Sequence, residues 1–215
     1  MTAIVNYFQD CCTFQSDELG VGWDALQQIN KAWLLNSWHI IVDERPTMNK
    51  EITVSTWPSG FKGFYGTRNF LLQDGDGRVL AYANSLWVFV DTQTGHPSRV
   101  PEEIVSRYTQ EPPYPMKEVS RKIPVPAELT SLPPFTATPS YIDTNRHVNN
   151  GGYVRMASDY LPKDFSCKQL RVEYRNAAVE GDLIQPSRSL TEDTCTIVLA
   201  AEDNKPFAIV EYSTI

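Results

Sequence analysis

The chain has 215 residues, which places it at the upper limit of one domain or the lower limit of two. Its composition is 41% hydrophobic, 11% aromatic and 21% charged, which excludes a disordered chain, a fibre and a coiled coil. The net charge of −7, with no run of basic residues, argues against a nucleic-acid partner.

The apolar runs are short, and the segment 86–90 is far below the roughly 20 residues that a membrane-spanning helix needs. No membrane span is therefore predicted. Residues 1–10 have neither a basic segment nor an unbroken apolar stretch, so no secretory signal is expected. The four cysteines form no Cys-x-x-Cys pair and are expected to be free thiols in the cytoplasm.

The first half of the chain is predicted to contain one helix and four strands. Apolar residues recur at three- and four-residue steps in the helix, and β-branched and aromatic residues dominate the strands. In chain order these elements are 4–19, 32–42, 51–56, 63–73 and 79–91. The sequence Asp-Gly-Asp-Gly at 74–77 predicts a hairpin, because such turns need residues that tolerate positive φ.

The second half repeats this order. The predicted helix and four strands are 150–161, 169–178, 183–190, 195–201 and 206–212, with a hairpin at 202–205. Between the halves, the segment 97–139 holds ten of the 15 prolines and is predicted to be an extended connection. Because it is long for a loop, part of it should pack against the surface, with 121–125 as the candidate.

One helix followed by a meander of strands, repeated once, predicts an α+β fold with antiparallel sheets. Tight hairpins leave no room for the crossovers of a parallel sheet, so a Rossmann fold is excluded. We therefore expect an N-terminal domain at 1–96, the proline-rich connection at 97–139 and a C-terminal domain at 140–215.

Several common motifs are absent from the sequence. It has no Gly-x-Ser-x-Gly elbow, no complete dinucleotide fingerprint and no EF-hand loop. The three histidines are too dispersed for a local zinc motif. We predict neither a metal nor a nucleotide.

The segment 141–153 concentrates polar residues before the second helix. If it is extended, Asp143, Asn145 and His147 share one face, because side chains alternate along a strand. Such a set suits attack on a carbonyl: the acid orients a partner, the amide donates a hydrogen bond or holds a water, and the imidazole exchanges protons. The alternative is that these are turn and cap residues with a structural or solvated histidine.

The start of this helix is unusual. Asn149 or Asn150 is expected to be its N-cap. Gly151 and Gly152 are poor helix formers, which suggests that another group approaches the backbone there. The free N–H groups at a helix start also suit a developing oxyanion.

Asp143-x-Asn145-x-His147-Val148-Asn149-Asn150, followed by Tyr153, resembles the active-site signature of the acyl-[acyl-carrier-protein] thioesterases, a plant and bacterial family of two hotdog domains. Further segments are similar to members of this family: 6–10, 19–22, 56–60, 68–70, 83–87, 171–175 and 181–182. The resemblance covers nearly the whole chain.

The resemblance implies a tandem double hotdog, in which each half wraps a curved antiparallel sheet around a long helix. It implies hydrolysis of fatty acyl-carrier-protein thioesters to free fatty acid and carrier thiol, which ends chain elongation. Asp143, Asn145 and His147 would be the catalytic set, with no dissociable cofactor. The partner would be an acyl carrier protein whose acyl chain is linked to 4'-phosphopantetheine; a homodimer is left open.

Substrate contacts are expected in both halves. By resemblance, the catalytic loop lies in the second hotdog, where Asn149, Asn150 and Gly151 would contact substrate. The first hotdog would hold the acyl chain, with Trp57 and Gly60 lining its channel. For a Trp before Pro, structural packing is the alternative.

The sequence departs from the family pattern in two places. Ala177 and Ala178 stand where plant members place an acidic residue and a cysteine, so we expect water to attack the thioester without an acyl-enzyme. The family usually has a strand before its first helix, whereas this helix begins within a few residues of Met1. The first strand of the N-terminal half is therefore expected to be missing.

Two other functions stay open. A hotdog hydratase or dehydratase would also use histidine and an acid beside a thioester, but the helix-borne pattern of that family is absent. A non-catalytic or weakened acyl-thioester binder is suggested by Ala177, Ala178 and the missing first strand. Four arginines could contact an acidic carrier or simply be solvated: Arg68, Arg155, Arg171 and Arg175.

Overall fold

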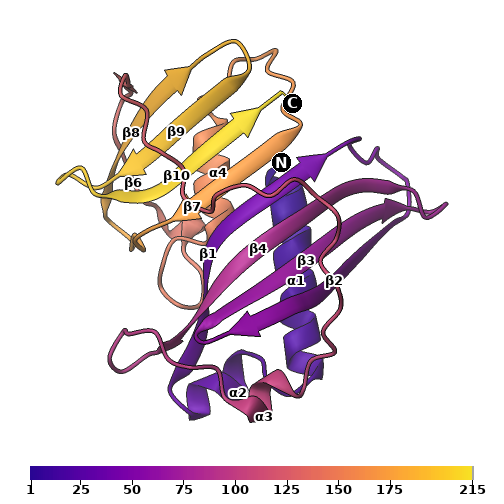
Figure 1. Cartoon of the computed structure of the whole chain (residues 1–215). Coiled ribbons are helices and arrows are strands. Elements are labelled where there is room, and N and C mark those ends of the chain that lie inside the picture. The colour runs from indigo at the N-terminus through magenta and orange to yellow at the C-terminus, as the bar shows by residue number, and fades with distance from the viewer. Residues whose placement is uncertain (215) are drawn as a thin grey trace. The chain divides into compact units, whose positions relative to one another are not determined.

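The computed structural model describes residues 1–214, which fall into two units (Figure 1). The first unit comprises Ala3–Val119, and the second comprises the residues from Ser120 onward together with Met1 and Thr2. The division lies inside the segment 97–139. The functional domain boundaries given above stay a prediction.

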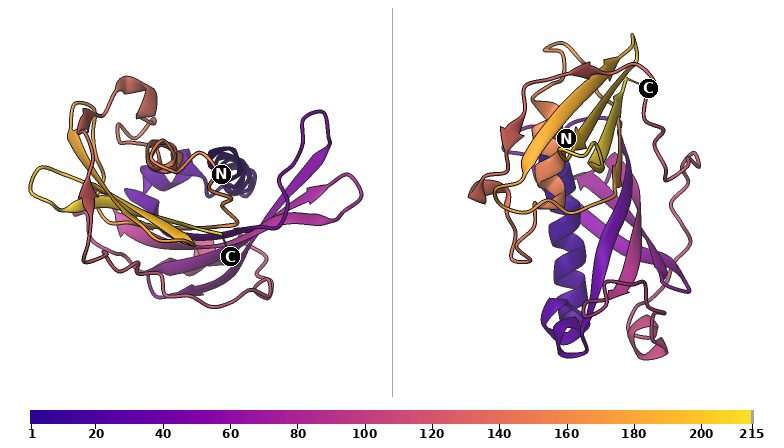
Figure 2. Two further views of the ribbon diagram at one scale, coloured as in Figure 1. Left: turned by 90° about the horizontal axis from the view of Figure 1, so that it is seen from above. Right: turned by 90° about the vertical axis from the view of Figure 1, so that its left-hand side faces the viewer.

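The first unit is a four-stranded antiparallel sheet with a long helix along one face. Its strand order is β2–β3–β4–β1. Figure 2 shows α1 on the concave face of the curved sheet. The elements are α1 (Thr2–Glu18), α2 (Trp23–Gln28), β1 (Lys31–Val42), β2 (Ile52–Lys62), β3 (Tyr65–Asp74), β4 (Val79–Asp91) and α3 (Glu102–Val105).

The second unit has the same plan. Its main sheet has the order β7–β10–β9–β8, and two short strands, β5 and β6, also pair with β8. The elements are β5 (Thr130–Ser131), β6 (Phe135–Thr136), η1 (Pro139–Tyr141), α4 (Asn150–Ser158), β7 (Gln169–Tyr174), β8 (Leu183–Leu190), β9 (Thr194–Ala200) and β10 (Pro206–Ser213).

Apolar periodicity explains why α1 is a helix that packs on a sheet. Its buried residues, Ile4, Val5, Phe8 and Cys12, recur at helical spacing and face the strands. The ring of Phe8 lies 5.1 Å from that of Phe70 on β3, between centroids, and both side chains are fully buried. In α4 the buried set is Gly151, Tyr153, Val154, Met156 and Ala157.

The predicted order of one helix and four strands, repeated once, is confirmed. Both predicted hairpins are present, and each contains a residue with positive φ: Gly77 at 81° and Asn204 at 63°. The strand predicted at 51–56 was too short, because β2 continues to Lys62. Pro58 is tolerated there since β2 is the end strand of its sheet and carries a bulge between Pro58 and Gly60.

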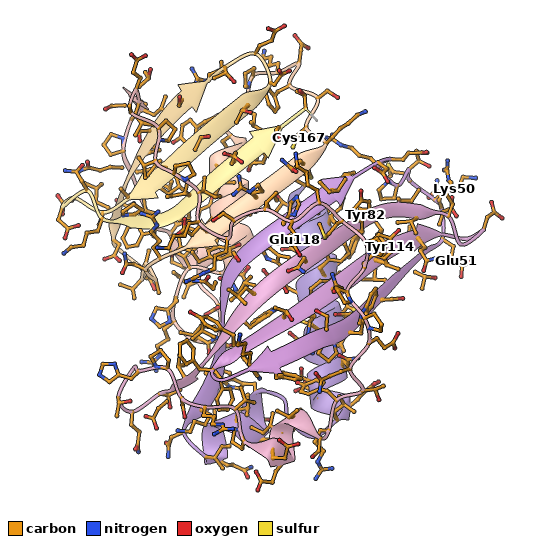
Figure 3. The ribbon with its side chains drawn as sticks, viewed as in Figure 1. Lys50, Glu51, Tyr82, Tyr114, Glu118 and Cys167 are labelled. Carbon is orange, nitrogen blue, oxygen red and sulfur yellow. The ribbon has the colours of Figure 1, made fainter. Side chains whose placement is uncertain are left out.

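The proline-rich segment packs against the sheets. In the first unit the N–H of Glu111 donates to the Pro58 carbonyl (3.1 Å), and the ring of Tyr114 packs in a tilted orientation against that of Tyr82 on β4, with 5.0 Å between the ring centroids (Figure 3). In the second unit Ile123 is buried, and its N–H donates to a carboxylate oxygen of Glu173 on β7 (2.8 Å). The prediction that 121–125 packs on the surface is confirmed.

A search of residues 1–214 found no helix with the length and hydropathy needed to span a membrane.

Candidate active site

The residues that carry the sequence signature form a short loop between η1 and α4. Two isolated bridges fix its ends: Ile142 pairs with Val148, and His147 pairs with Val179. In addition, the N–H of Val148 donates to the carbonyl of Ala178 (2.8 Å). The loop is therefore anchored to the segment that follows β7.

The extended conformation expected for 143–147 is wrong, because these residues form a tight reverse turn. The N–H of Asp143 donates to the His147 carbonyl (2.8 Å), and the N–H of Arg146 donates to the Asp143 carbonyl (3.0 Å). Arg146 has a φ of 63°, a left-handed conformation that is uncommon for a residue other than glycine. Period-two alternation does not apply to such a turn.

The carboxylate of Asp143 stabilises the turn by hydrogen bonds to its backbone. One of its oxygens accepts hydrogen bonds from the N–H of Asn145 (2.8 Å) and of His147 (3.4 Å). This is the Asx-turn arrangement, in which a short acidic side chain replaces a backbone acceptor. Asp143 thus contacts the backbone of the other two predicted catalytic residues.

The turn leaves the functional groups of Asn145 and His147 exposed. Within the described chain, neither side chain hydrogen-bonds to another side chain, so the structure does not form a bonded triad. The structure instead presents an amide and an imidazole two residues apart on a braced turn. An amide can donate to a carbonyl oxygen, and an imidazole can exchange protons near neutral pH.

The start of α4 is capped by Asn149, as predicted. Its side-chain oxygen accepts the N–H of Gly151 (2.8 Å), and its carbonyl accepts the N–H of Gly152 (2.8 Å). The N–H groups of Gly151 and Gly152, two of those expected to suit an oxyanion, are therefore already hydrogen-bonded. The close neighbours at Gly152 are protein atoms, since a Cβ there would lie 3.4 Å from both Tyr141 and Val148. Substrate contacts by Asn149, Asn150 and Gly151 stay a prediction.

Two buried tyrosines hold the other side of the loop. The hydroxyl of Tyr153 accepts the N–H of Ala178 (2.8 Å), and the hydroxyl of Tyr174 donates to the Asn150 carbonyl (2.9 Å). Burial raises the pKa of Tyr153 to about 12, so this hydroxyl stays neutral. Ala178 is fully buried, whereas its neighbour Ala177 is exposed.

Replacing Tyr153 by phenylalanine should destabilise the fold by about 1–3 kcal/mol, because the buried N–H of Ala178 loses its acceptor. Denaturant unfolding of the full chain measures this change. The matched control is Tyr160→Phe, whose hydroxyl makes no hydrogen bond within residues 1–214. Equal stability of the Tyr153→Phe and Tyr160→Phe variants would contradict the assignment.

The cysteines of the second unit are poor nucleophiles. Cys167 and Cys195 are both buried, and burial raises the pKa of the Cys195 thiol. A thiol attacks a carbonyl only as the exposed thiolate. Neither residue therefore replaces the cysteine that plant members place at the position of Ala178.

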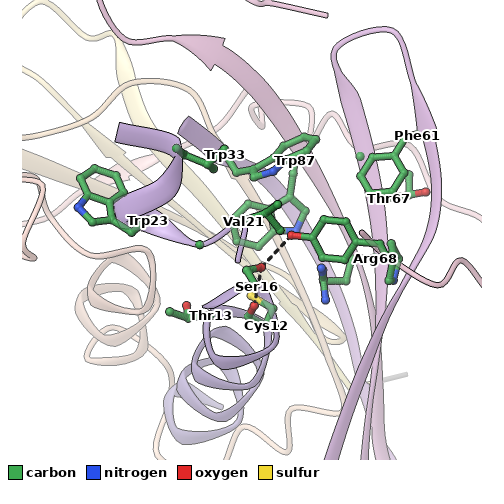
Figure 4. A pocket seen from close by; sticks show the side chains of 15 residues that line it. Cys12, Thr13, Ser16, Val21, Trp23, Trp33, Phe61, Thr67, Arg68 and Trp87 are labelled. Atoms are coloured by element: carbon green, nitrogen blue, oxygen red, sulfur yellow. Dashed lines mark hydrogen bonds between the residues drawn. The ribbon is translucent and has the colours of Figure 1, made fainter. Parts of the chain in front are cut away.

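The first unit contains a cavity of about 150 Å³ between α1 and the sheet. Trp57 and Gly60 do not line it. The indole N–H of Trp57 instead donates to the Pro112 carbonyl (3.0 Å), so a substrate contact by these two residues stays a prediction. The lining residues are Cys12, Thr13, Ser16, Val21, Gly22, Trp23, Leu26, Trp33, Pro58, Phe61, Gly66, Thr67, Arg68, Trp87 and Tyr108 (Figure 4).

Sequence reasoning missed Arg68 as a residue of this cavity. Its side chain is buried at 7% exposure, so the expectation that it is solvated or meets a carrier on the surface is wrong. The strand pattern contained the signal: Arg68 lies in the alternating series Gly66, Arg68, Phe70 and Leu72, all of which are buried.

The other three arginines have surface positions. Arg171 forms an ion pair with Glu211 (2.7 Å), and Arg175 forms one with Glu173 (3.0 Å). Both arginines are therefore paired with glutamates of the second sheet. Arg155 is exposed, and its guanidinium lies 5.9 Å from the ring of Tyr141.

Comparison with known proteins matches both halves of the chain to one family. Residues 1–108 match the acyl-ACP thioesterase N-terminal domain, and residues 130–208 match the C-terminal domain. The chain is 28% identical over 195 residues to a chloroplastic palmitoyl-acyl carrier protein thioesterase of Arabidopsis thaliana, covering 80% of this chain and 45% of that protein. The chain spans about half the length of the curated relatives it matches.

Solved structures share the fold. An acyl-ACP thioesterase from Bacteroides thetaiotaomicron superposes with a TM-score of 0.90 at 24% identity, over 99% of this chain and 88% of the other. The 12:0-ACP thioesterase of Umbellularia californica gives a TM-score of 0.83 at 18% identity, with the same coverage. These likenesses confirm the predicted double hotdog. With both of its domains matched, the chain belongs to the acyl-ACP thioesterase family.

Proposed function

We propose that the chain hydrolyses fatty acyl-carrier-protein thioesters to free fatty acid and carrier thiol. The observation that carries this proposal is the braced turn at 143–147, which presents an exposed amide and an exposed imidazole two residues apart. Membership of the family supports the substrate class. The partner is an acyl carrier protein that bears the chain on 4'-phosphopantetheine.

In the proposed reaction, the imidazole of His147 accepts a proton from a water molecule. The water oxygen attacks the thioester carbonyl carbon, while the side-chain N–H of Asn145 donates a hydrogen bond to the carbonyl oxygen as it gains charge. The tetrahedral intermediate then expels the sulfur. His147 returns its proton to that sulfur, which leaves a carboxylic acid and the carrier thiol.

No acyl-enzyme forms in this scheme. The two cysteines of the second unit are buried, and burial opposes formation of the Cys195 thiolate. Of the other side chains in the turn, Thr144 has an exposed hydroxyl without a hydrogen-bonded base, so it is not activated as a nucleophile. Water is the remaining nucleophile.

Asp143 serves as a positioning residue. Its carboxylate is already bonded to the N–H groups of Asn145 and His147, which holds the turn in the conformation that exposes their side chains. It acts through the loop and not on the substrate. This role requires a side-chain oxygen acceptor at position 143 and does not require a hydrogen bond between the imidazole and the carboxylate.

The proposal is tested by the products. The full chain is incubated with acyl carrier proteins that bear saturated chains of several lengths and with one that bears a 2-enoyl chain. Mass spectrometry then follows carrier thiol, free acid and hydrated acyl carrier. We expect thiol and acid in equal amounts from the saturated substrates.

Two outcomes would overturn the proposal. Hydration of the 2-enoyl substrate without thiol release would identify a hydratase. Tight binding of the acyl carrier without release of acid would identify a binding protein. The matched control is carrier protein and substrate without the enzyme, which measures spontaneous hydrolysis.

A further inference from the structure

The cavity of the first unit has a mainly apolar lining that also contains polar side chains. Aromatic rings form much of the lining, and Trp33 approaches so closely that a Cβ on Gly66 would lie 3.0 Å from its ring. The polar lining residues include Arg68, Ser16 and Tyr108, of which the last two share a hydrogen bond of 2.9 Å (Figure 4). Such a lining suits an aliphatic ligand with a polar terminus.

Neutral side chains supply both hydrogen-bond acceptors of the Arg68 guanidinium. One of its nitrogens, Nη1, donates to the side-chain oxygens of Gln15 and Thr56, the latter at 3.2 Å. The ring of Tyr108 lies 5.3 Å from the guanidinium carbon. No Asp or Glu of the described chain forms an ion pair with Arg68.

The positive charge of Arg68 affects a neighbouring group that lines the cavity. Burial raises the pKa of the Cys12 thiol to about 11, and the positive charge of Arg68 opposes that rise. Buried charges are costly unless they are paired, and most are paired with an opposite charge. A guanidinium is best complemented by a carboxylate, with which it can form two parallel hydrogen bonds. The first unit thus holds one half of an ion pair, Arg68, in the lining of a mainly apolar cavity.

We propose that this cavity binds a short aliphatic chain that ends in a carboxylate, with the carboxylate against Arg68. A cavity of about 150 Å³ accommodates a ligand the size of benzene, so the chain has about six carbons. Two sources share this chemistry: a free fatty acid, or an acyl group whose far end carries a carboxylate. The inference goes beyond thioester hydrolysis, and ligand binding tests it without turnover.

The first experiment compares ligands on the unaltered chain. Hexanoate, monomethyl adipate and hexan-1-ol have similar chains, but only the first two carry a carboxylate. Quenching of tryptophan fluorescence reports binding, because Trp33 and Trp87 line the cavity. We expect at least one carboxylate to bind roughly tenfold or more tightly than hexan-1-ol, as a charge-assisted hydrogen bond implies.

The two carboxylate ligands distinguish a free fatty acid from an acyl group whose far end carries a carboxylate. Preference for hexanoate alone assigns the cavity to a free fatty acid. Binding of monomethyl adipate, whose ester end mimics the thioester, assigns it to an acyl group with a distal carboxylate. Equal affinity of hexan-1-ol and both carboxylates overturns the proposal.

Variants test whether Arg68 causes the preference for carboxylate over hexan-1-ol. Arg68→Gln should remove the preference for carboxylate, and Arg68→Lys should retain part of it, since lysine keeps the charge. Arg107→Gln is the control, because Arg107 is an exposed arginine of the same unit. A carboxylate preference that survives in Arg68→Gln overturns the proposal. If that variant does not fold, Arg68→Lys is compared with Arg107→Gln, and a carboxylate preference as large in Arg68→Lys as in Arg107→Gln overturns the proposal.

Discussion

Replacing His147 by alanine should lower kcat for acyl-carrier-protein hydrolysis by about 10²–10⁴-fold, the range expected for loss of a general base. In the proposed reaction this imidazole both activates the water and protonates the departing sulfur. Asn145→Ala should lower kcat by about 10²–10³-fold, because the developing charge on the carbonyl oxygen loses a hydrogen-bond donor. Both values come from steady-state release of carrier thiol.

Thr144→Ala is the matched control for both variants. Thr144 lies in the same turn, is exposed, and makes no hydrogen bond through its side chain within residues 1–214. Its replacement should leave kcat within a factor of about two, as expected for a surface substitution. A His147→Ala variant that hydrolyses substrate as fast as Thr144→Ala would refute the assigned role of the imidazole.

Removing the Asp143 side chain should lower kcat by about 100-fold, the cost of displacing catalytic groups by about 1 Å. In Asp143→Ala the N–H groups of Asn145 and His147 lose their shared acceptor, and the turn relaxes. Asp143→Asn keeps an oxygen at that position and should retain most of the activity. The alanine variant should also change kcat more than KM, because the loop is displaced while the rest of the substrate contacts remain.

The comparison between the two Asp143 variants distinguishes positioning from chemistry. If Asp143 acts by its charge on substrate or water, asparagine should be as damaging as alanine, and the brace assigned to it would be wrong. Far-UV circular dichroism shows whether both variants keep the fold. The pH profile of kcat adds a second readout. If the Asp143 carboxylate only holds the turn and transfers no proton, the profile of Asp143→Asn should have the same shape as that of the unaltered chain.

Much of the fold follows from local sequence signals. Apolar periodicity located α1 and α4, and residues that tolerate positive φ located the hairpins at Gly77 and Asn204. These features depend on a few neighbouring residues and can be predicted from spacing alone. The short helix α2 lacks a capping side chain at Gly22, and this absence of a start signal explains why it was missed.

The candidate site was predictable in residue identity but not in geometry. The sequence signature selected Asp143, Asn145 and His147, yet the assumed alternation failed because the Asp143 carboxylate replaces a backbone acceptor and closes a turn. Arg68 was missed for a different reason. Its place in the alternating buried series of β3 indicates an inward side chain, but the neighbours that surround it there, such as Gln15 and Tyr108, are distant in the chain.

In the proposed mechanism, water activated on the turn at 143–147 releases the acyl group without a covalent enzyme intermediate. A mass-spectrometric time course of the full chain with saturated acyl carrier protein, quenched in acid, tests this mechanism directly. We predict that free acid and carrier thiol appear together while the intact mass of the enzyme stays unchanged. An enzyme mass increased by one acyl group, or the absence of free acid, would contradict it.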